Sequence, residues 1–422
     1  MGYVMTIFDS LRAILMPKNE LPPPAVKPVV YPEVASTYSH RTKKIVTDET
    51  SKRISTAYRC ANILSDDIAS MPFQVFEKRG RNIERIMPDG IARNIAYLLE
   101  IQPNRNMVPL IFMKTCVDWL IHWGNAYIWT PQQPYREMFI LRADQTYPVF
   151  DQDGSLWYKT IFPSGKQETI PGVEVAQLMI NPKDGLIGRS VLTFARDTIG
   201  RQQGAQETQD RIQGNGLTPG GIIWTAKEVE SREARQKIRD AYLESVSGSE
   251  HSGGVAVLDP KISKFEPVTM KPVDAQFLES ILATDAQIAN FYGMPLYKLN
   301  LGKQSYESNE QQNIDYLRTT LNPYLKQFEQ VARVKWLRLE EQGTRYFRFN
   351  RDSLLQTDAK SRAEFKKTMI ETGQMSPNEG RAIDDISPYA GGDGYYFPAN
   401  FGRIQPDGSI VGGTVDATQQ KV

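Results

Sequence analysis

Residues 274–341 read DAQFLESILATDAQIANFYGMPLYKLNLGKQSYESNEQQNIDYLRTTLNPYLKQFEQVARVKWLRLEE. The first part has apolar residues every three or four positions, with Thr284 as the one polar member of the stripe: Phe277, Ile281, Ile288 and Tyr292. A second stripe continues this spacing further along: Ile314, Leu317, Leu321, Leu325, Phe328, Ala332, Trp336 and Leu339. A helix places such residues on one face, whereas a strand would scatter them. We therefore expect two long helices, the second kinked at Pro323, which removes an internal hydrogen bond.

The segment between these helices, residues 300–308, reads NLGKQSYES. The Gly and Ser residues of this loop allow mobility, and its charges nearly cancel. None of its residues is a candidate catalytic residue. A loop held between long helices is typical of a part that moves or contacts something large rather than one that does covalent chemistry.

Composition restricts the class of protein. A chain of 422 residues predicts roughly two or three domains. Hydrophobic residues make up 40% and charged residues 23%, as in ordinary folded soluble proteins. The 50 Lys and Arg residues nearly balance the 49 Asp and Glu residues. This balance argues against a protein that grips nucleic acid by neutralising phosphates, although it does not exclude contact with DNA that must slide.

Residues suited to metal or redox chemistry are few. Cys60 and Cys116 lie in apolar helical patterns and are expected to be buried free thiols of a reducing compartment. His40, His122 and His251 have no metal-ligand spacing, and His122 is expected in a core or an interface. We therefore predict no metal site, no cofactor and no catalytic residue.

The most apolar stretch, residues 107–129, contains Lys114, Asp118 and His122. These polar side chains argue against a membrane span.

The chain before about residue 188 predicts an α+β region. An amphipathic helix is expected within residues 4–15 and an extended, proline-rich linker at residues 21–28, followed by helices at residues 51–70, 90–101 and 108–123. Strands are expected at residues 73–77, 126–130, 137–141, 147–150, 156–162 and 175–180. Hairpin-type turns at Asp153–Gly154 and Ser164–Gly165 favour a mostly antiparallel sheet.

Two further segments do not supply an apolar face of their own. The helix expected at residues 188–213 loses its apolar stripe after Ile199, so it projects into solvent or packs through polar contacts on neighbouring chains. Residues 214–268 predict a small module with strands at residues 221–224 and 254–258 around a helix at 227–246. If the two strands pair in parallel, their crossover is right-handed. So small a core suggests stabilisation by other subunits.

The remaining elements are a strand at residues 345–349, a helix at 358–372 and a helix that begins at Ser376-Pro377. The tail after residue 391 is rich in Gly, Asp and Gln, and we expect it to be largely disordered.

The order of these elements carries a resemblance. From about residue 51 to residue 389 the sequence resembles the portal proteins of tailed bacteriophages, specifically the short siphovirus portals related to lambdoid phages. Short motifs in this order carry it: YRCANILSDDIASMP (58–72), GNAY (124–127), GLIGRS (185–190), PGG (219–221), IANFYGMP (288–295) and YESNEQ (306–311). Each is weak alone, but their order and spacing together are specific.

The resemblance implies a ring, usually a dodecamer, at one capsid vertex, with a channel for packaging and ejection of double-stranded DNA. The implied partners are the terminase large subunit, a head–tail connector or adaptor protein and the major capsid protein, without a membrane. The implied location is the virion, after assembly in the host cytoplasm. ATP hydrolysis belongs to the terminase, so the portal itself is no enzyme.

The resemblance also divides the chain into regions. They are an N-terminal arm and linker (1–50), the first part of the wing (51–187), a stem helix (188–217), the clip (218–270), a second stem helix (271–296), the tunnel loop (297–308), the kinked helix and strand of the wing (309–354), the crown (355–395) and a flexible tail (396–422). The implied DNA-facing residues are Lys303, Gln304, Ser305 and Tyr306. The implied docking residues of the clip are Lys227, Glu230, Arg235 and Arg239.

Alternatives remain open from the residues alone. A monomeric capsid-associated scaffold or binding protein, and an enzyme of nucleic-acid processing, are the competing hypotheses. Lys303 is expected either to make transient phosphate contacts or to be a plain solvated lysine.

Overall fold

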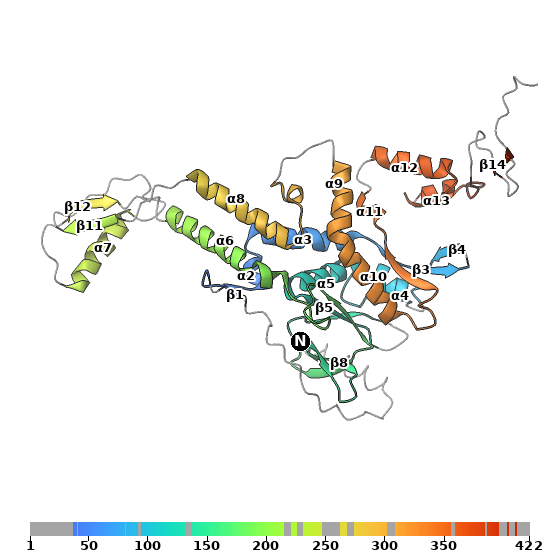
Figure 1. Cartoon of the computed structure of the whole chain (residues 1–422), viewed down its shortest axis with the longest axis horizontal. Coiled ribbons are helices and arrows are strands. Elements are labelled where there is room, and N and C mark those ends of the chain that lie inside the picture. Colours follow the sequence, from blue (N-terminus) through green and yellow to red (C-terminus); the bar gives the residue numbers. More distant parts are fainter. Residues whose placement is uncertain are drawn as a thin grey trace, which may run out of the picture. The chain divides into compact units, whose positions relative to one another are not determined.

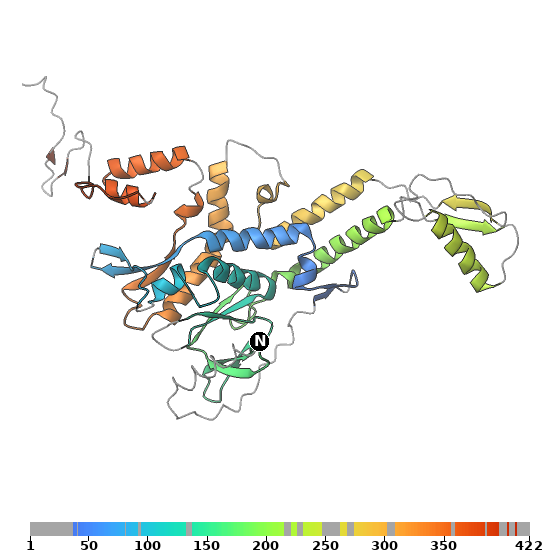
Figure 2. The same cartoon turned by 180° about the vertical axis from the view of Figure 1, so that it is seen from behind.

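A computed structural model describes residues 37–39, 41–80, 82–91, 94–131, 137–214, 221–225, 231–246, 262–267, 274–301, 309–355, 359–384, 386–395, 403–404 and 410–411. The chain divides into two units, Met1–Asn350 and Arg351–Val422. The helices and strands of the first unit are drawn in Figure 1 and, from behind, in Figure 2. The predicted segments at residues 4–15 and 21–28 lie outside the described residues.

Two helices form the centre of the first unit. Helix α3 (Ser55–Ser70) packs along α5 (Pro109–Trp123). The face of α3 that is buried has the predicted helical spacing: Ala57, Cys60, Ala61, Leu64 and Ile68. Helix α5 ends at Gly124, whose φ of 76° suits a residue without a side chain. Cys60 and Cys116 are both free and buried, which confirms that prediction.

The second predicted stripe forms a broken helix. Helix α9 (Asn309–Tyr316) leads into a π-helical turn, η4 (Leu317–Leu321), and then into α10 (Asn322–Trp336). The backbone N–H of Asn322 donates to the carbonyl oxygen of Leu317, five residues earlier. Pro323 cannot donate a hydrogen bond in an α-helical ladder, and the ladder shifts register just before it. The helix is therefore irregular directly before Pro323, where a kink was predicted, and the irregularity is a π turn.

Most of the predicted stripe is buried: Leu317, Leu321, Leu325, Phe328, Ala332 and Trp336. Two of its members are not. Ile314 is partly exposed, and the prediction for Leu339 is wrong, because the helix ends at Trp336 and the side chain of Leu339 is 85% exposed. Leu337, in extended backbone directly after the helix, is buried in its place.

The sheets are antiparallel, as expected. Strand β3 (Phe73–Arg79) lies between β13 (Arg345–Phe349) and β4 (Asn82–Arg85). Phe73 stacks on Phe349 with ring centroids 4.2 Å apart, and both rings contact Phe328 of α10. Residues 73–79 and 345–349 are far apart in sequence, so this aromatic cluster closes the core around α10.

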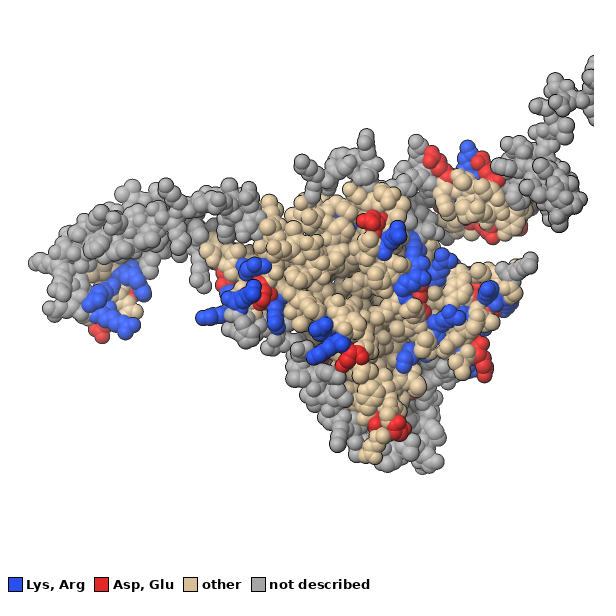
Figure 3. Space-filling model, viewed as in Figure 1, with Lys and Arg blue, Asp and Glu red and all other residues tan. Residues whose placement is uncertain are grey.

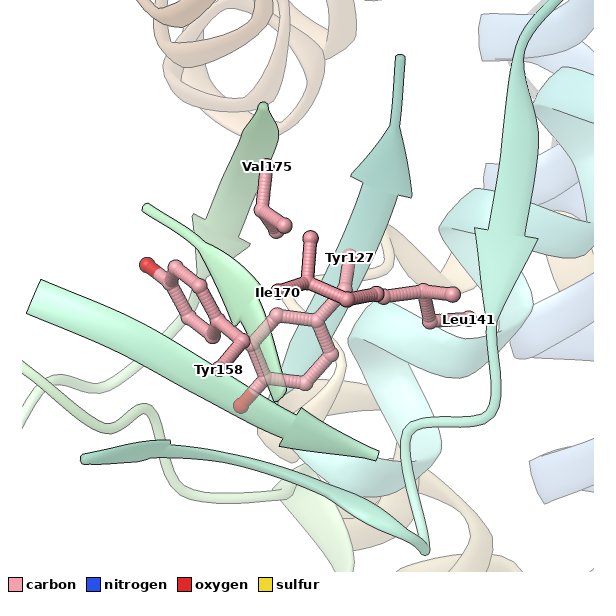
Figure 4. Close-up of a cluster of buried hydrophobic side chains, with 5 residues drawn as sticks. All are labelled: Tyr127, Leu141, Tyr158, Ile170 and Val175. Atoms are coloured by element: carbon pink, nitrogen blue, oxygen red, sulfur yellow. The ribbon is translucent and has the colours of Figure 1, made fainter. Parts of the chain in front are cut away.

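Two more three-stranded sheets share a small core. The first has the order β10-β5-β6, with β5 (Asn125–Trp129) between β10 (Val175–Met179) and β6 (Phe139–Leu141). The second has β8 (Leu156–Ile161) between β7 (Thr146–Phe150) and β9 (Gln167–Pro171), and β9 was not predicted. Their shared cluster is Tyr127, Leu141, Tyr158, Ile170 and Val175 (Figure 4).

The small module differs from one expectation. Strand β11 (Gly221–Thr225) pairs with β12 (Ile262–Pro267), and helix α7 (Arg232–Val246) lies between them in sequence. The strands are antiparallel, and β12 was not predicted. The strand predicted at residues 254–258 lies outside the described residues.

The remaining described elements of the first unit are five short ones and the two long helices α6 and α8. They are β1 (Thr37–Ser39), β2 (Lys44–Val46), α2 (Asp48–Ser51), α4 (Ile95–Glu100), α6 (Val191–Gly214), α8 (Asp274–Phe291) and the 3-10 turn η2 (Leu296–Leu299).

The second unit contains α11 (Asp352–Leu355), α12 (Ala359–Glu371), α13 (Pro377–Ala382) and the antiparallel pair β14 (Arg403–Ile404) and β15 (Ile410–Val411). Helix α13 begins as predicted, with Ser376 and Glu379 forming a reciprocal capping box and Pro377 in the first turn. Asn378, which is buried, donates to the carbonyl oxygen of Tyr389 and accepts from its N–H, so it fixes the loop that follows α13.

Candidate functional site: the root of the two long helices

Helices α6 and α8 run side by side in both views of the first unit (Figures 1 and 2). Among the residues of α6 whose burial is described, the apolar buried face lies in the first part of the helix, at Val191, Leu192, Ala195 and Ile199. Residues 207–210 are all exposed. In α8, Ile288 and Ala289 near the C-terminal end are fully buried. The pair is thus rooted in the core by apolar contacts at one end, and the described remainder of α6 is polar.

A polar contact joins these two helices to α3. The Thr56 hydroxyl of α3 donates to Asp285 Oδ1 of α8 at 2.6 Å, and Gln202 Nε2 of α6 lies 3.4 Å from the same oxygen. Gln202 is only 4% exposed. A buried amide needs hydrogen-bond partners, and Asp285 accepts from two different helices, so these side chains fix the angle at which α6 and α8 leave the core.

Sequence reasoning missed these three residues. The available signal was the polar pair Thr284-Asp285 within the otherwise apolar stripe of the first helix. Such an interruption predicts a buried polar contact, but its partners are 229 residues away for Thr56 and 83 residues away for Gln202.

A second junction holds the start of α6. Asn125 Nδ2 donates to the Gly188 carbonyl oxygen at 2.9 Å, and the Gly188 N–H donates back to Asn125 Oδ1 at 2.9 Å. A Cβ on Gly188 would lie 2.1 Å from the Gly124 carbonyl oxygen, and a Cβ on Gly124 would lie 2.4 Å from the Arg189 carbonyl carbon. Both positions therefore require glycine.

The GNAY and GLIGRS motifs are thus the two halves of one contact. Gln177 Nε2 completes it by donating to Asn125 Oδ1 at 3.0 Å and to the Leu186 carbonyl oxygen at 2.8 Å. These motifs attach α6 to the central strand β5, which is a structural role rather than a phosphate-binding one.

The β1–β2 hairpin packs against the same helix. Ser39 Oγ donates to Asp197 Oδ1 at 2.8 Å, and Lys44 pairs with Glu207. A Cβ on Gly200 would lie 2.4 Å from the Thr42 hydroxyl oxygen, so this glycine lets the hairpin approach α6 closely.

A charge cluster lies where residues just before α3 meet α5. Lys52 Nζ is 2.8 Å from Asp118 Oδ2, and His122 Nδ1 is 3.2 Å from Asp118 Oδ1. Burial alone would raise the pKa of Asp118, but His122 and Lys52 outweigh it and lower this pKa to about 2. His122 is 4% exposed, as expected for a core histidine.

Of the predicted site residues, Arg235 and Arg239 are the two that the structure describes. Lys303, Gln304, Ser305, Tyr306, Lys227 and Glu230 are outside the described residues. Arg235 and Arg239 are exposed on α7, one turn apart, and Arg239 pairs with the exposed Asp240 at 2.7 Å. The described elements on either side of residues 302–308 are η2 and α9.

The charged side chains of the described surface are mixed. Figure 3 shows Lys and Arg in separate small groups, most of them with Asp or Glu nearby, rather than in one continuous basic band. None of the helices within the described residues is long and apolar enough to span a membrane.

Comparison with known proteins decides the family. Residues 55–385 match the family model described as phage portal protein. This chain belongs to the phage portal protein family. The portal subunit is 26% identical over 355 residues to the portal protein of Enterobacteria phage HK97, covering 82% of each chain. It is 25% identical to the probable portal protein of Streptomyces phage phiC31, covering 85% of this chain and 80% of that one.

Solved structures share the fold. An HK97 family phage portal protein from Corynebacterium diphtheriae matches with a TM-score of 0.56 and 14% identity, over 75% of the portal subunit and 99% of that chain. A chain in the neck of a native gene transfer agent particle, computed with C12 symmetry, matches with a TM-score of 0.54 and 18% identity, over 86% and 97% of the two chains. The α+β portal-type fold predicted from the sequence is confirmed.

The function of the chain follows from its family. It is a structural protein of the virion that forms a ring at one capsid vertex, the channel through which double-stranded DNA is packaged and ejected. The same ring is the docking site for the packaging terminase and for head–tail connector proteins.

Proposed function

We propose that the portal subunit assembles as one of twelve copies whose α6 and α8 helices stand side by side as the stem of the channel. In this assignment the stem comprises residues 188–217 and 271–296, the clip 218–270, the wing 51–187 and 309–354, and the crown 355–395. Residues 1–50 are an arm and linker, and residues 396–422 a C-terminal tail. The tunnel loop, residues 297–308, faces the DNA through Lys303, Gln304, Ser305 and Tyr306.

The observation that carries this proposal is the polar surface of α6 beyond its apolar root. Residues 207–210 of α6 are exposed, and Arg201 of α6 reaches Gln287 of α8 through a surface hydrogen bond of 3.1 Å. A long helix without an apolar outer face gains nothing by folding back on its own core, but it can pack through polar contacts against identical helices in a ring.

Charge supports the same use. The formal net charge of the chain is +1, and the basic groups in Figure 3 are interspersed with acidic ones. Each tight phosphate contact would have to break as DNA advances, so a channel that passes DNA benefits from few of them. We expect the contacts of Lys303 with phosphate to be transient.

The partners are proposed to divide among the regions. The terminase large subunit, and after packaging the head–tail connector, dock on the clip through Lys227, Glu230, Arg235 and Arg239. The major capsid protein surrounds the wing, and the ring assembles in the host cytoplasm before DNA enters. The portal subunit itself has no catalytic activity and needs no cofactor; ATP hydrolysis is the task of the terminase.

Electron microscopy and native mass spectrometry of the purified chain test the assembly. We expect an annular particle of twelve subunits with an open axial channel. A stable monomer at micromolar concentration in an assembly-permissive buffer would contradict the ring and favour a monomeric scaffold.

The docking assignment has its own test. Arg235 and Arg239 lie on one face of α7, so the double substitution Arg235→Glu and Arg239→Glu should weaken terminase binding at least tenfold while the ring still forms. Lys237→Glu, which changes charge on a different face of the same helix, is the matched control. Equal losses with both variants would show that α7 contributes only general electrostatic attraction.

A further inference from the structure

The 3-10 turn η2 connects the end of α8 to the segment that precedes α9. The chain enters it through Gly293, which has a φ of 64° and whose carbonyl oxygen accepts from Thr320 Oγ1 at 2.7 Å. It leaves through Asn300, also in the left-handed region with a φ of 59°. Leu299 is the single buried residue of η2 itself, at 8% exposure. Apolar packing therefore contributes little to holding this turn in place.

Polar contacts hold it instead. Lys298 Nζ lies 3.8 Å from Asp67 Oδ2 of α3 and 4.6 Å from the centroid of the Tyr316 ring at the end of α9. The Tyr297 hydroxyl donates to the Gln312 carbonyl oxygen of α9 at 2.8 Å. The turn is thus tied both to the central helix α3 and to α9.

Two buried groups face the Lys298 ammonium. Within the described residues, neither Asp67 Oδ2 nor the Tyr316 hydroxyl has a hydrogen bond of normal geometry, although the two side chains also interact with each other. Burial raises the pKa of Asp67, and Lys298 opposes that rise. Burial, followed by the nearby charge of Asp67, raises the pKa of Tyr316. Asp67 is therefore poorly solvated, and the Lys298 ammonium offsets that cost, while Tyr316 stays neutral and offers the ammonium its ring face.

Lys298 is therefore a common partner of α3, through Asp67, and of α9, through Tyr316. A buried carboxylate is expensive without a countercharge, and an aromatic face in a buried setting attracts a cation. Without the ammonium, α3 and α9 would each lose their polar contact with this side chain, and Tyr297 alone would tie η2 to α9 through a side-chain hydrogen bond to Gln312.

We propose that Lys298 is a positioning residue for DNA passage. By pairing with Asp67 and lying over Tyr316, it fixes η2 and the end of α9 against α3, and so sets the direction in which the chain enters and leaves residues 302–308. This inference rests on the proposed function, in which that segment faces the DNA.

Hydrogen exchange on assembled rings tests the positioning directly. Lys298→Met keeps much of the side-chain length but removes the charge, and it should speed amide exchange in residues 296–300 and 309–317 by about tenfold. Lys298→Arg keeps the charge and should restore most of the protection. The matched control is Lys326→Met, because the exposed Lys326 pairs with Glu329 on α10 at 3.9 Å. Unchanged exchange in Lys298→Met would overturn the proposal.

A second variant covers the case in which Lys298→Met rings fail to assemble. Asp67→Asn keeps the shape of the side chain and removes the partner charge, so it should speed exchange in residues 296–300 while the ring forms. Normal exchange in Asp67→Asn would count against the proposal as decisively as normal exchange in Lys298→Met.

DNA packaging by the same rings separates this inference from the proposed function. Faster exchange together with a severalfold loss of packaged DNA supports both. Faster exchange with unchanged packaging keeps Lys298 as the residue that positions η2 and overturns its part in DNA passage, while the DNA-facing role proposed for residues 302–308 still stands on its own tests.

Discussion

A half-buried carboxylate pairs with a lysine near each end of α3, yet the two pairs are built differently. Near the N-terminal end, Asp118 has Lys52 at 2.8 Å and the His122 ring at 3.2 Å. At the C-terminal end, Asp67 has Lys298 at 3.8 Å. The pKa of Asp118 is lowered, whereas burial raises that of Asp67. The same residue types therefore make two different contacts. We call the contact of Asp118 with Lys52 and His122 the firm joint, and the contact of Asp67 with Lys298, beside the segment proposed to face DNA, the weak joint.

The largest expected effect comes from breaking the firm joint. Asp118→Ala leaves Lys52 and His122 without their shared carboxylate, and losing this half-buried pair should cost about 2 kcal/mol. Urea denaturation of the purified chain measures this change in the free energy of unfolding. Glu371→Ala, which breaks the exposed pair with Lys367 on α12, is the control and should change it by less than about 0.5 kcal/mol. Similar losses in both variants would abolish the distinction between the two ends of α3.

Acid should weaken the firm joint next. Because the folded-state pKa of Asp118 is about 2 against an ordinary 3.8, its contribution is complete above about pH 4 and is lost as the pH falls towards 2. The shift corresponds to about 2 kcal/mol. Denaturation curves at pH 5, 4 and 3 should therefore show a steeper loss in the wild type than in Asp118→Asn. Parallel curves would mean that Asp118 does not titrate as an ion pair.

The weak joint should respond in the opposite direction. Since the folded-state pKa of Asp67 is raised, protonation favours the folded state, and the contribution of Asp67 to stability improves as the pH falls. Asp67→Asn should then change the free energy of unfolding at pH 7 by less than about 1 kcal/mol, because Lys298 can turn its ammonium towards water. Thermal unfolding at pH 7 and pH 5 would measure both effects. A loss as large as that of Asp118→Ala would contradict the comparison.

The smallest effect belongs to the pair between the two joints. Lys114 lies 2.5 Å from Asp66, but their side chains are 35% and 53% exposed. Asp66→Ala should change stability by less than about 0.5 kcal/mol in a thermal melt, and 0.5 M salt should remove even that difference. A clear destabilisation would show that the α3–α5 contact depends on surface charge.

The sequence predicted the elements better than their contacts. The burial of Leu321, Leu325 and Phe328 followed from helical periodicity, because a repeating apolar face needs only local information. Strand β4 was missed because all four of its residues are exposed, so no alternation marks it. Leu339 failed as a prediction because the helix ended at Trp336, where packing rather than propensity sets the boundary.

The candidate site was less predictable for a different reason. The motifs containing Gly124 and Gly188 were recognisable as strings, but the atoms that make both glycines necessary belong to each other's motif. The Lys298–Asp67 pair likewise joins two residues that lie 231 positions apart in the sequence. A single sequence carries no record of such distances, so roles that depend on them emerge only from the fold.

The number of residues in the π turn at Leu317–Leu321 sets how α9 is rotated relative to α10. A π turn holds one residue more than the α-helical turn it replaces, and each residue of an α-helix advances the face by about 100°. Deleting one residue here would convert the turn to regular helix and rotate α9 by that angle relative to α10, moving Tyr316 away from Lys298. The phase of the helix, and not only its composition, is thus part of what this segment encodes.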